Sequence, residues 1–390
     1  MREAEAFQAG ITALQAGRGV EARDLFQAAI AAGNGSPRLH LGLALAHLGQ
    51  GDTGAAEGAV NQVLIAEPHN LRALIMKGDL LVGRDDPQNA TAHYNLVLRL
   101  AATLAEVPAP LGTELSRIES AIAQLGAAFQ QHLVDRLRAA GYRPESASER
   151  FNASLEMLLG RKERSDPGLN FPQAPHAFYM ADMPYHTFYP RERLPWMAEI
   201  ENETDAIEAE LAALLATGAD RFAPYVHSGL DQPQQGETRL LDSEDWTSAF
   251  LWRDGDPDSA VLECCPHTRE IMEGLPLTRV RGLAPSVLFS KLDGGARIDP
   301  HTGLLNCRLI CHLPLVVPPG CGLRVGDDRR ETRRGEAWAF DDSVNHEAWN
   351  DSEAARIILL FDVWRPELDE GERHLVTSVL EAVSGFGNPA

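Results

Sequence analysis

The first hundred or so residues of the chain repeat with a period of 34, and this repetition constrains the fold more than any other feature. Five sets of positions align across three copies: Gly10, Ala44 and Gly78; Leu14, Leu48 and Val82; Ala22, Ala56 and Ala90; Phe26, Val60 and Tyr94; and Ile30, Leu64 and Leu98. Small residues let two helices approach, and large apolar residues fill the space beside them. The pattern predicts three consecutive helix pairs.

This period and spacing resemble those of tetratricopeptide repeats, although the first helices lack the usual tryptophan. We expect residues 1–105 to form three such repeats and to build a short α-helical solenoid. The concave face of a solenoid often binds an extended peptide or a protein. The array is equally suited to packing against the rest of the chain or to self-association, so the sequence leaves its role open.

Residues 106–165 have the features of a helical cap or linker. An amphipathic run that ends at Gly141 predicts one helix, because glycine is a common helix terminator. A second helix follows, and Ser146 and Glu149 resemble a capping box at its start.

The composition changes at Lys162, where a stretch rich in proline and aromatic residues begins. We place a boundary there and assign residues 166–390 to a second domain. Its segment 183–190 is expected to wrap that domain, because aromatic residues seldom stay in water in such numbers. Residues 196–217 indicate one amphipathic helix with an acidic, solvated face. Residues 220–236 are expected to form a mobile loop around a site.

Two histidines, His301 and His346, stand at the edges of short runs with strand character, and Arg356 opens the next apolar run. Ile358 and Leu360 share the face of Arg356, since side chains alternate along a strand. An arginine inside an apolar interior requires an anionic partner, which a bound dicarboxylate would supply. Neutral imidazole suits iron, copper, nickel and zinc, so the two histidines alone do not name a metal.

The run at residues 308–317 has two distinct faces. Arg308, Ile310 and His312 lie on one, and the other is wholly apolar: Leu309, Cys311, Leu313, Leu315 and Val317. Strands that are apolar on both faces predict the interior of a sandwich or barrel. A zinc site built from Cys307, Cys311 and His312 is disfavoured because His312 points away from the cysteines, which we expect to act as small hydrophobes.

Several motifs of this region resemble those of the aspartyl/asparaginyl β-hydroxylase family. They are PHTG at residues 300–303, NCRL at 306–309, His312, FDDS at 340–343, HEAW at 346–349 and DVWRPEL at 362–368. Members of this family are iron(II)- and 2-oxoglutarate-dependent dioxygenases built on a double-stranded β-helix, a type of jelly roll. The resemblance implies an α+β multidomain chain, in which the helical repeats precede a jelly-roll oxygenase domain.

The resemblance also assigns metal ligands. His301 and His346 correspond to the two iron ligands of the family. The carboxylate of the usual facial triad is missing, because Gly303 stands at its position. The family also has glycine there, and water is expected to fill the vacant site. Asp299 lies on the wrong side of His301 to replace that carboxylate.

A cosubstrate site follows from the same resemblance. Arg356 and Ser290 correspond to the residues that hold the distal carboxylate of 2-oxoglutarate, and His312 to a residue at its other end. Trp246 corresponds to a tryptophan that lines the same pocket.

One position departs from the animal members of the family. Ile310 stands where they have a second arginine that contacts a carboxylate of the cosubstrate or the substrate. Arg308 is retained, and we expect it to take part of that role as a substrate-binding residue.

The implied reaction is hydroxylation of an unactivated C–H with O2, releasing succinate and CO2. The expected substrate is an Asp/Asn-type residue of a peptide or protein, or a related amino-acid-like molecule. Two alternatives are a non-catalytic tetratricopeptide adaptor with an oxygenase-like sensing domain, and a cupin-type metalloenzyme that does not use 2-oxoglutarate. Intact His301, His346 and Arg356 favour the oxygenase.

Charge and cysteine content restrict the partners and the compartment. The formal net charge of −21 argues against nucleic acid and anionic membranes as partners. Five cysteines without a disulfide-domain pattern predict a reducing compartment. We see neither a signal peptide nor an apolar run of about 20 residues that could cross a bilayer, so we expect a cytoplasmic protein.

Overall fold

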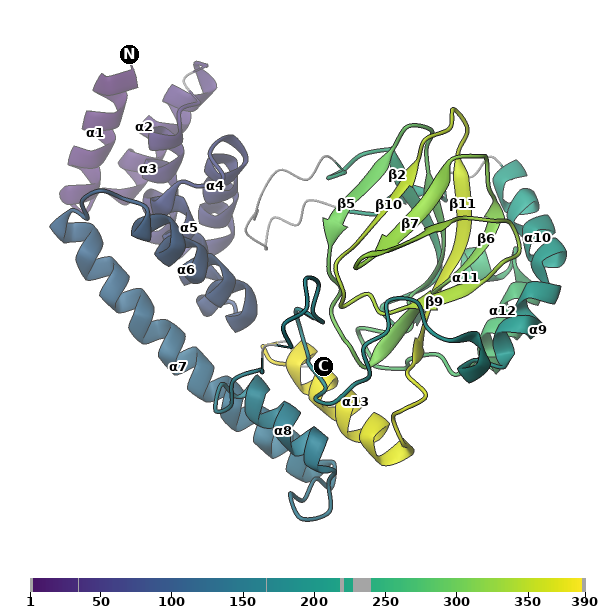
Figure 1. Ribbon diagram of the computed structural model, residues 1–390. Helices are drawn as coiled ribbons and strands as arrows, with labels where there is room; N and C mark the ends of the chain where they lie inside the picture. Colours follow the sequence, from purple (N-terminus) through teal and green to yellow (C-terminus); the bar gives the residue numbers. More distant parts are fainter. Residues whose placement is uncertain (1–2, 34, 166, 218–220, 227–239, 388–390) are drawn as a thin grey trace. The chain divides into compact units, whose positions relative to one another are not determined.

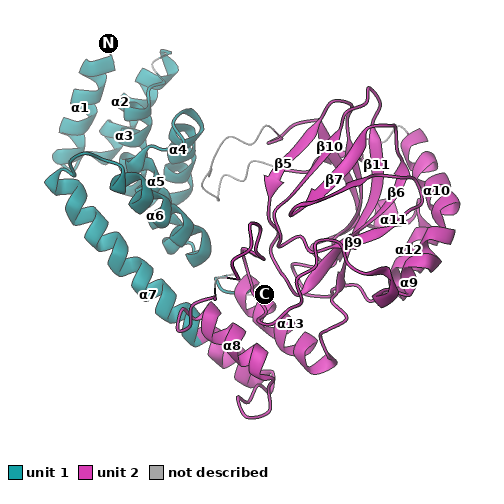
Figure 2. Cartoon of the chain, in the orientation of Figure 1, with its two compact units in different colours: residues 1–131, 228–237, 385–390 teal, residues 132–227, 238–384 magenta. Residues whose placement is uncertain are grey.

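The structure is a computed structural model that describes residues 3–33, 35–165, 167–217, 221–226 and 240–387. The chain divides into two compact units, coloured separately in Figure 2. Of the described residues, 3–131 and 385–387 belong to the first unit, and 132–226 and 240–384 belong to the second.

The first unit is α-helical and contains three consecutive helix pairs (Figure 1). The helices are α1 (Glu3–Gln15), α2 (Gly19–Ala31), α3 (Pro37–Leu48), α4 (Thr53–Ala66), α5 (Leu71–Gly83) and α6 (Pro87–Ala102). The side chains of Asp52, Asn70 and Asp86 accept hydrogen bonds from backbone N–H groups in the first turns of α4, α5 and α6.

The aligned small and large residues contact each other within the helix pairs. A Cβ atom at Gly10 would lie 2.4 Å from the ring of Phe26, and one at Gly78 would lie 2.4 Å from the ring of Tyr94. In the middle pair, Val60 takes the place of the aromatic residue, and it belongs to the same apolar cluster as Ala44. In the first and third pairs, the 34-residue period therefore reflects a ring of the second helix packed onto the backbone of the first.

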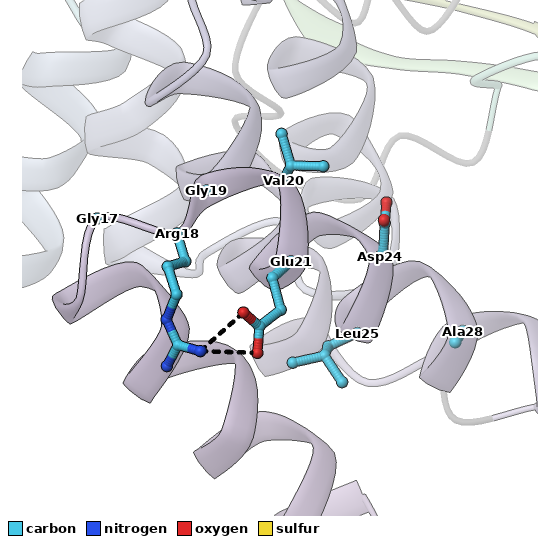
Figure 3. Close-up of a pocket in the computed structure, with 8 residues that line it drawn as sticks. All are labelled: Gly17, Arg18, Gly19, Val20, Glu21, Asp24, Leu25 and Ala28. Carbon is cyan, nitrogen blue, oxygen red and sulfur yellow. Dashed lines mark hydrogen bonds and ion pairs between the residues drawn. The ribbon is translucent and has the colours of Figure 1, made fainter.

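A hollow lies at the turn between α1 and α2 (Figure 3). Its arginine, Arg18, forms an ion pair of 2.8 Å with Glu21 on the following turn, and both side chains are about half exposed. The hollow therefore offers no uncompensated charge from this arginine.

Two further helices, α7 (Ala109–Ala139) and α8 (Glu149–Leu158), follow the repeats. Gly141 has φ +89° just beyond α7, as a helix terminator does. The predicted capping box was wrong. The cap of α8 is Ser148, not Ser146, because the Ser148 hydroxyl accepts from Phe151 N–H at 3.2 Å.

The second unit is built on two antiparallel sheets (Figure 1). The larger contains β1 (Ala223–Pro224), β2 (Trp246–Arg253), β3 (Asp256–Pro257), β4 (Val287–Leu292), β6 (Arg308–Val316), β9 (Trp338–Phe340) and β11 (Arg356–Trp364). The smaller has the order β5-β10-β7-β8, with β5 (Arg297–His301), β7 (Cys321–Val325), β8 (Asp328–Glu331) and β10 (His346–Asn350). Helical repeats followed by antiparallel sheets confirm the predicted α+β class.

Each face of the larger sheet buries a separate apolar cluster. The face that bears Leu309 and Leu359 packs against helices α9 (Trp196–Asn202), α10 (Thr204–Ala216), α11 (Ser259–Leu262) and α12 (Pro266–Gly274). The opposite face joins residues of the smaller sheet, such as Leu323 and Ala348, in a second cluster. The alternation predicted for residues 308–317 is therefore confirmed along β6, which ends at Val316, one residue before Val317.

The prediction of one helix over residues 196–217 was wrong. The structure has two helices, α9 and α10, that meet at Glu203. The Thr204 hydroxyl donates to the carbonyl of Glu201 at 2.6 Å, which is a local bond of the kind that competes with a continuous helix.

Other predicted segments are described only in part. Within the predicted loop at residues 220–236, the structure describes residues 221–226, and the others lie outside the described residues. A short 3₁₀ turn, η1 (Arg191–Arg193), precedes α9, and α13 (Glu370–Ser384) follows the last strand. No helix within the described ranges is both long and apolar enough to cross a membrane.

Candidate functional site

A cavity of about 420 Å³ opens among strands of both sheets in the second unit. All seven site residues predicted from the sequence line it: Trp246, Ser290, His301, Arg308, His312, His346 and Arg356. They come from β2, β4, β5, β6, β10 and β11, so residues far apart in the sequence share one chamber. The chemical roles assigned to them remain predictions.

The two candidate metal ligands face each other across neighbouring strands. His301 and His346 are paired residues of β5 and β10, and their ring centroids are 4.1 Å apart. The Nδ1 atom of His301 lies 2.8 Å from the carbonyl of Asp299, and that of His346 lies 3.0 Å from the carbonyl of Val344. A carbonyl only accepts hydrogen bonds, so each Nδ1 carries the proton and each Nε2 keeps a free lone pair.

The surroundings also keep these rings uncharged. Desolvation lowers the pKa of His301, and desolvation together with the adjacent His301 ring lowers the pKa of His346 to about 3. Both imidazoles are therefore neutral near pH 7, which is the form that binds a metal.

At position 303, where the usual triad has a carboxylate ligand, this chain has glycine. A Cβ atom at Gly303 would lie 1.8 Å from Oδ2 of Asp342, so the carboxylate of Asp342 fills the space beside this glycine. Burial raises the pKa of Asp342 to about 7. Asp299 is exposed and holds His301 through its backbone carbonyl. Among the described residues, no group of three or more His, Cys, Asp or Glu side chains is arranged to hold a metal.

Asp342 was missed by the sequence analysis. The available signal was the pairing of a glycine at position 303 with two consecutive acids, Asp341 and Asp342, in the FDDS motif. The two acids have different partners, since Asp341 binds Arg365 at 3.0 Å whereas Asp342 lines the cavity.

Substituting alanine for Gly303 tests this close approach. We expect Gly303→Ala to destabilise the second unit by about 1–3 kcal/mol, because the new methyl group would overlap Asp342. Thermal unfolding measures the loss. Gly274→Ala is the control, because a Cβ at Gly274 meets nothing within 4 Å. Equal melting temperatures for the two variants would contradict the arrangement.

Arg356 lines the same cavity. It is 2 % exposed, and among the described residues its Nε has no hydrogen-bond partner. Burial lowers its pKa to about 10. Ser290 lies in the same cavity and receives a hydrogen bond of 3.0 Å from Nε1 of Trp246. No ion pair of Arg356 is found among the described residues, and a buried guanidinium without an anionic neighbour is costly, so an anion bound beside it would be favourable.

Arg308 is in a different situation. Its guanidinium lies 3.5 Å from Asp342 and 3.4 Å from Asp362, and both carboxylates are buried. On the same strand face, His312 is 6 % exposed, and its pKa is lowered well below the usual value, first by desolvation and then by the charge of Arg356. Cys307 and Cys311 are buried as small hydrophobes.

A strap formed by residues 171–189 holds the segments that carry the two histidines. Ala174 N–H donates to the carbonyl of Ser343 at 2.7 Å, and His176 N–H donates to the carbonyl of Gly303 at 3.1 Å. Gly303 N–H in turn donates to the carbonyl of Asp342 at 2.6 Å. The strap thus joins the chain just after His301 to the chain just before His346. It wraps the second unit, as the sequence predicted for residues 183–190.

Gln173 is the side chain that anchors this strap. Its Nε2 donates to Asp341 at 2.6 Å, and its Oε1 accepts from Asn306 at 3.1 Å. We expect Gln173→Ala to lower the free energy of unfolding by about 1.5–3 kcal/mol, since a bond to a charged group is lost. Denaturant unfolding tests this. Tyr185→Phe is the control, because it removes one exposed bond to the strap backbone, and a loss as large as that of Gln173→Ala would rule out a specific anchor.

Comparisons with known proteins match two regions of the chain. The family described as aspartyl/asparaginyl β-hydroxylase matches residues 201–366, and a tetratricopeptide repeat family matches residues 13–80. The human aspartyl/asparaginyl β-hydroxylase is 34 % identical over 154 residues, which cover 39 % of this chain and 20 % of the human protein.

Two other relatives extend the comparison. Human aspartate β-hydroxylase domain-containing protein 2 is 25 % identical over 217 residues, covering 55 % of this chain and 56 % of that protein. The ornithine lipid ester-linked acyl 2-hydroxylase of Rhizobium tropici is 30 % identical over 181 residues, which cover 46 % of this chain and 60 % of that protein. The chain thus spans between one fifth and three fifths of the length of these relatives.

Among solved structures, the cupin domain of Schizosaccharomyces pombe Cnp3 aligns with a TM-score of 0.22 at 6 % identity, covering 32 % of this chain and 67 % of that one. A likeness this weak adds nothing to the fold described above. The sequence matches lead to one conclusion. The chain carries an aspartyl/asparaginyl β-hydroxylase family domain at residues 201–366, preceded by tetratricopeptide repeats.

Proposed function

We propose that this protein is a hydroxylase that uses iron(II), 2-oxoglutarate and O2. The observation that carries the proposal is that Arg356, which is buried and has no ion pair among the described residues, shares one cavity with two neutral histidines whose protons are on Nδ1. The cavity thus combines an anion site with a metal site, which is what a metal-chelating dicarboxylate requires. The family match supports hydroxylase activity.

The residues present fit these groups. His301 and His346 would hold the iron, and Arg356 with Ser290 would hold the distal carboxylate of 2-oxoglutarate. Trp246 fixes the Ser290 hydroxyl through its 3.0 Å hydrogen bond. When bound, iron and 2-oxoglutarate supply the oxidation of a C–H bond by O2, in which 2-oxoglutarate becomes succinate and CO2.

The protein's own contribution is positioning and shielding. The two backbone carbonyls orient the imidazole rings, and the strap fixes the distance between the segments that carry them. Apolar side chains such as Ile298 and Ile358 line the rest of the cavity and limit the entry of water. The carboxylate of Asp342 fills the space beside Gly303, the position at which the usual triad has a protein carboxylate. Because Asp342 already fills that space, an aspartate at position 303 would not fit beside it.

We propose that the substrate is a peptide or protein with an Asp/Asn-type residue, and that the tetratricopeptide repeats recruit it or a partner protein. The repeats support protein interaction in general. A hydrocarbon chain is the second candidate substrate, because one relative is named as an acyl 2-hydroxylase and much of the cavity lining is apolar. The five unpaired cysteines support a reducing compartment such as the cytoplasm.

Succinate formation tests the reaction. The full chain is loaded anaerobically with iron(II), supplied with 2-oxoglutarate and O2, and succinate is measured by mass spectrometry. We expect slow succinate release without substrate, and none from the Arg356→Met variant at low 2-oxoglutarate. If wild-type protein neither binds 2-oxoglutarate nor forms succinate, the proposal fails and the adaptor reading takes its place.

A further inference from the structure

A stack of side chains adjoins the cavity and ends at Trp246. The ring of Tyr225 lies on the Trp246 indole, with their centroids 4.2 Å apart and their planes inclined by 25°. Tyr225 is also nearly parallel to Phe250, with 6.2 Å between the centroids and 9° between the planes. The guanidinium of Arg253 lies 4.0 Å from the centroid of the Phe250 ring. The four side chains therefore form one continuous stack.

The backbone sets the place of Tyr225 in this stack. β1 runs antiparallel to β2, and just beyond β1 the N–H of Tyr225 donates to the carbonyl of Trp246 at 2.9 Å. Tyr225 is therefore the cross-strand neighbour of Trp246. Positions two apart on a strand face the same way, so Trp246, Ser248 and Phe250 share one face of β2. Because Ser248 is small, it leaves room for the ring of Tyr225 between the two larger rings.

Trp246 connects the stack to Ser290 in the cavity. Its Nε1 donates to the Ser290 hydroxyl at 3.0 Å. The hydroxyl accepts this bond, so its own proton is available to an anion. A tilt of the indole about χ2 would move Nε1 away from Ser290, and the χ2 wells of tryptophan are broad. Within the described ranges, Tyr225 is the one ring stacked on the indole, and a ring on its face opposes that tilt.

Tyr225 supports the indole with its ring and not with its hydroxyl. The contact between the two residues is made by their ring faces, which are 4.2 Å apart between centroids. Phenylalanine can make the same contact, whereas leucine cannot. Tyr225 lines the cavity and is 36 % exposed, while Trp246 is 9 % exposed. A change at Tyr225 thus alters the outer, accessible member of the pair.

We propose that Tyr225 is a positioning residue for the cosubstrate, because its ring keeps the indole of Trp246 directed at Ser290 and so strengthens the binding of 2-oxoglutarate. This inference rests on the proposed function, in which Ser290 and Arg356 hold the distal carboxylate. Loss of the ring should weaken 2-oxoglutarate binding by about threefold to tenfold, the range expected for one aromatic pair. Metal binding should be unchanged, since Tyr225 acts only through Trp246.

Calorimetric titration of the Co(II)-loaded full chain with 2-oxoglutarate tests the proposal without turnover. We expect Tyr225→Leu to show the loss of affinity and to keep normal Co(II) binding, and Tyr225→Phe to stay within twofold of the wild type. Tyr142→Leu is the control, because the Tyr142 ring pairs with Phe151 at 5.7 Å and does not line the cavity. Wild-type affinity in Tyr225→Leu, or equal losses in the Leu and Phe variants, would overturn the inference.

Ser290→Ala tests whether the effect passes through the serine hydroxyl. In a double-mutant cycle, residues that act through one contact show coupled effects. We expect Tyr225→Leu to cost less than twofold in 2-oxoglutarate affinity once Ser290→Ala has removed the hydroxyl. A further loss as large as that in the wild-type background would mean that Tyr225 does not act through Ser290, which would overturn the inference.

NMR of the full chain with 15N-labelled tryptophan measures the support of the indole without any ligand. The Trp246 signal is identified by its loss in Trp246→Phe. Hydrogen exchange of this indole N–H should be at least threefold faster in Tyr225→Leu than in the wild type or Tyr225→Phe, and equal exchange in all three would contradict the inference.

The failure of the inference is distinct from the failure of the proposed function. If the wild-type chain does not bind 2-oxoglutarate, the proposed function fails, and the cosubstrate role of Tyr225 fails with it. If the wild-type chain binds 2-oxoglutarate and Tyr225→Leu binds it equally well, only the inference fails.

Discussion

Replacing His346 with alanine is expected to abolish metal binding and succinate formation. The structure offers two histidines at this site, and no third His, Cys, Asp or Glu in a metal-holding arrangement within the described ranges. Losing one of two protein ligands must cost more than the 10- to 100-fold loss of metal affinity that is typical when only a supporting residue is removed. Titration with Co(II), followed by its absorption spectrum, measures this directly without turnover.

The control for this experiment is a histidine of the same unit outside the cavity. His267 is about two fifths exposed and pairs with Glu203 at 2.8 Å. His267→Ala should keep the Co(II) spectrum and the succinate rate of the wild type. A His346→Ala protein that still binds Co(II) with near-normal affinity would remove the ligand assignment.

Replacing Arg356 with methionine is expected to separate stability from cosubstrate binding. In the absence of ligand, the guanidinium is buried and no ion pair for it is found in the described part of the chain, so an apolar side chain of similar length should leave stability unchanged or raise it. The affinity for 2-oxoglutarate should fall by about 30-fold or more, because truncating one partner of a buried charge pair costs 2–5 kcal/mol. Calorimetric titration and thermal unfolding measure the two effects.

Arg365 provides a sharp contrast, since it and Arg356 are the two largest fully buried side chains among the described residues. Arg365 forms an ion pair of 3.0 Å with the buried Asp341 and donates to two backbone carbonyls. Arg365→Met should therefore destabilise the protein by about 3–5 kcal/mol, because it leaves Asp341 uncompensated. Similar melting temperatures for the Arg356 and Arg365 variants would show that Arg356 has a structural partner after all.

Much of the fold could be predicted because its signals are local or periodic. The 34-residue period requires only that small residues such as Gly78 receive a ring such as Tyr94. Strand alternation placed Arg308 and Ile310 on one face of β6 and Leu309 on the other, and the cavity and the outer cluster confirm both faces. The cavity-facing positions of Arg356 and His312 followed from the same rule.

What could not be predicted depends on contacts between distant segments. The place of Asp342 beside Gly303 arises from the hydrogen-bonded approach of two loops. The pairing of Arg308 with Asp362 requires β6 and β11 to be neighbours in a known register. The break at Glu203 reflects one side-chain bond of Thr204, which hydrophobic periodicity does not record.

The pairing of β5 with β10 has a consequence for handling the protein. β5 is an edge strand of the smaller sheet, and its register with β10 shifts between His346 and Ala348. A metal ion bound by His301 and His346 would act as a cross-strand staple on this edge, and at one hundred times its Kd it would add about 2.7 kcal/mol to the folded state. Purification in chelator would therefore loosen an exposed strand, which is a common starting point for aggregation.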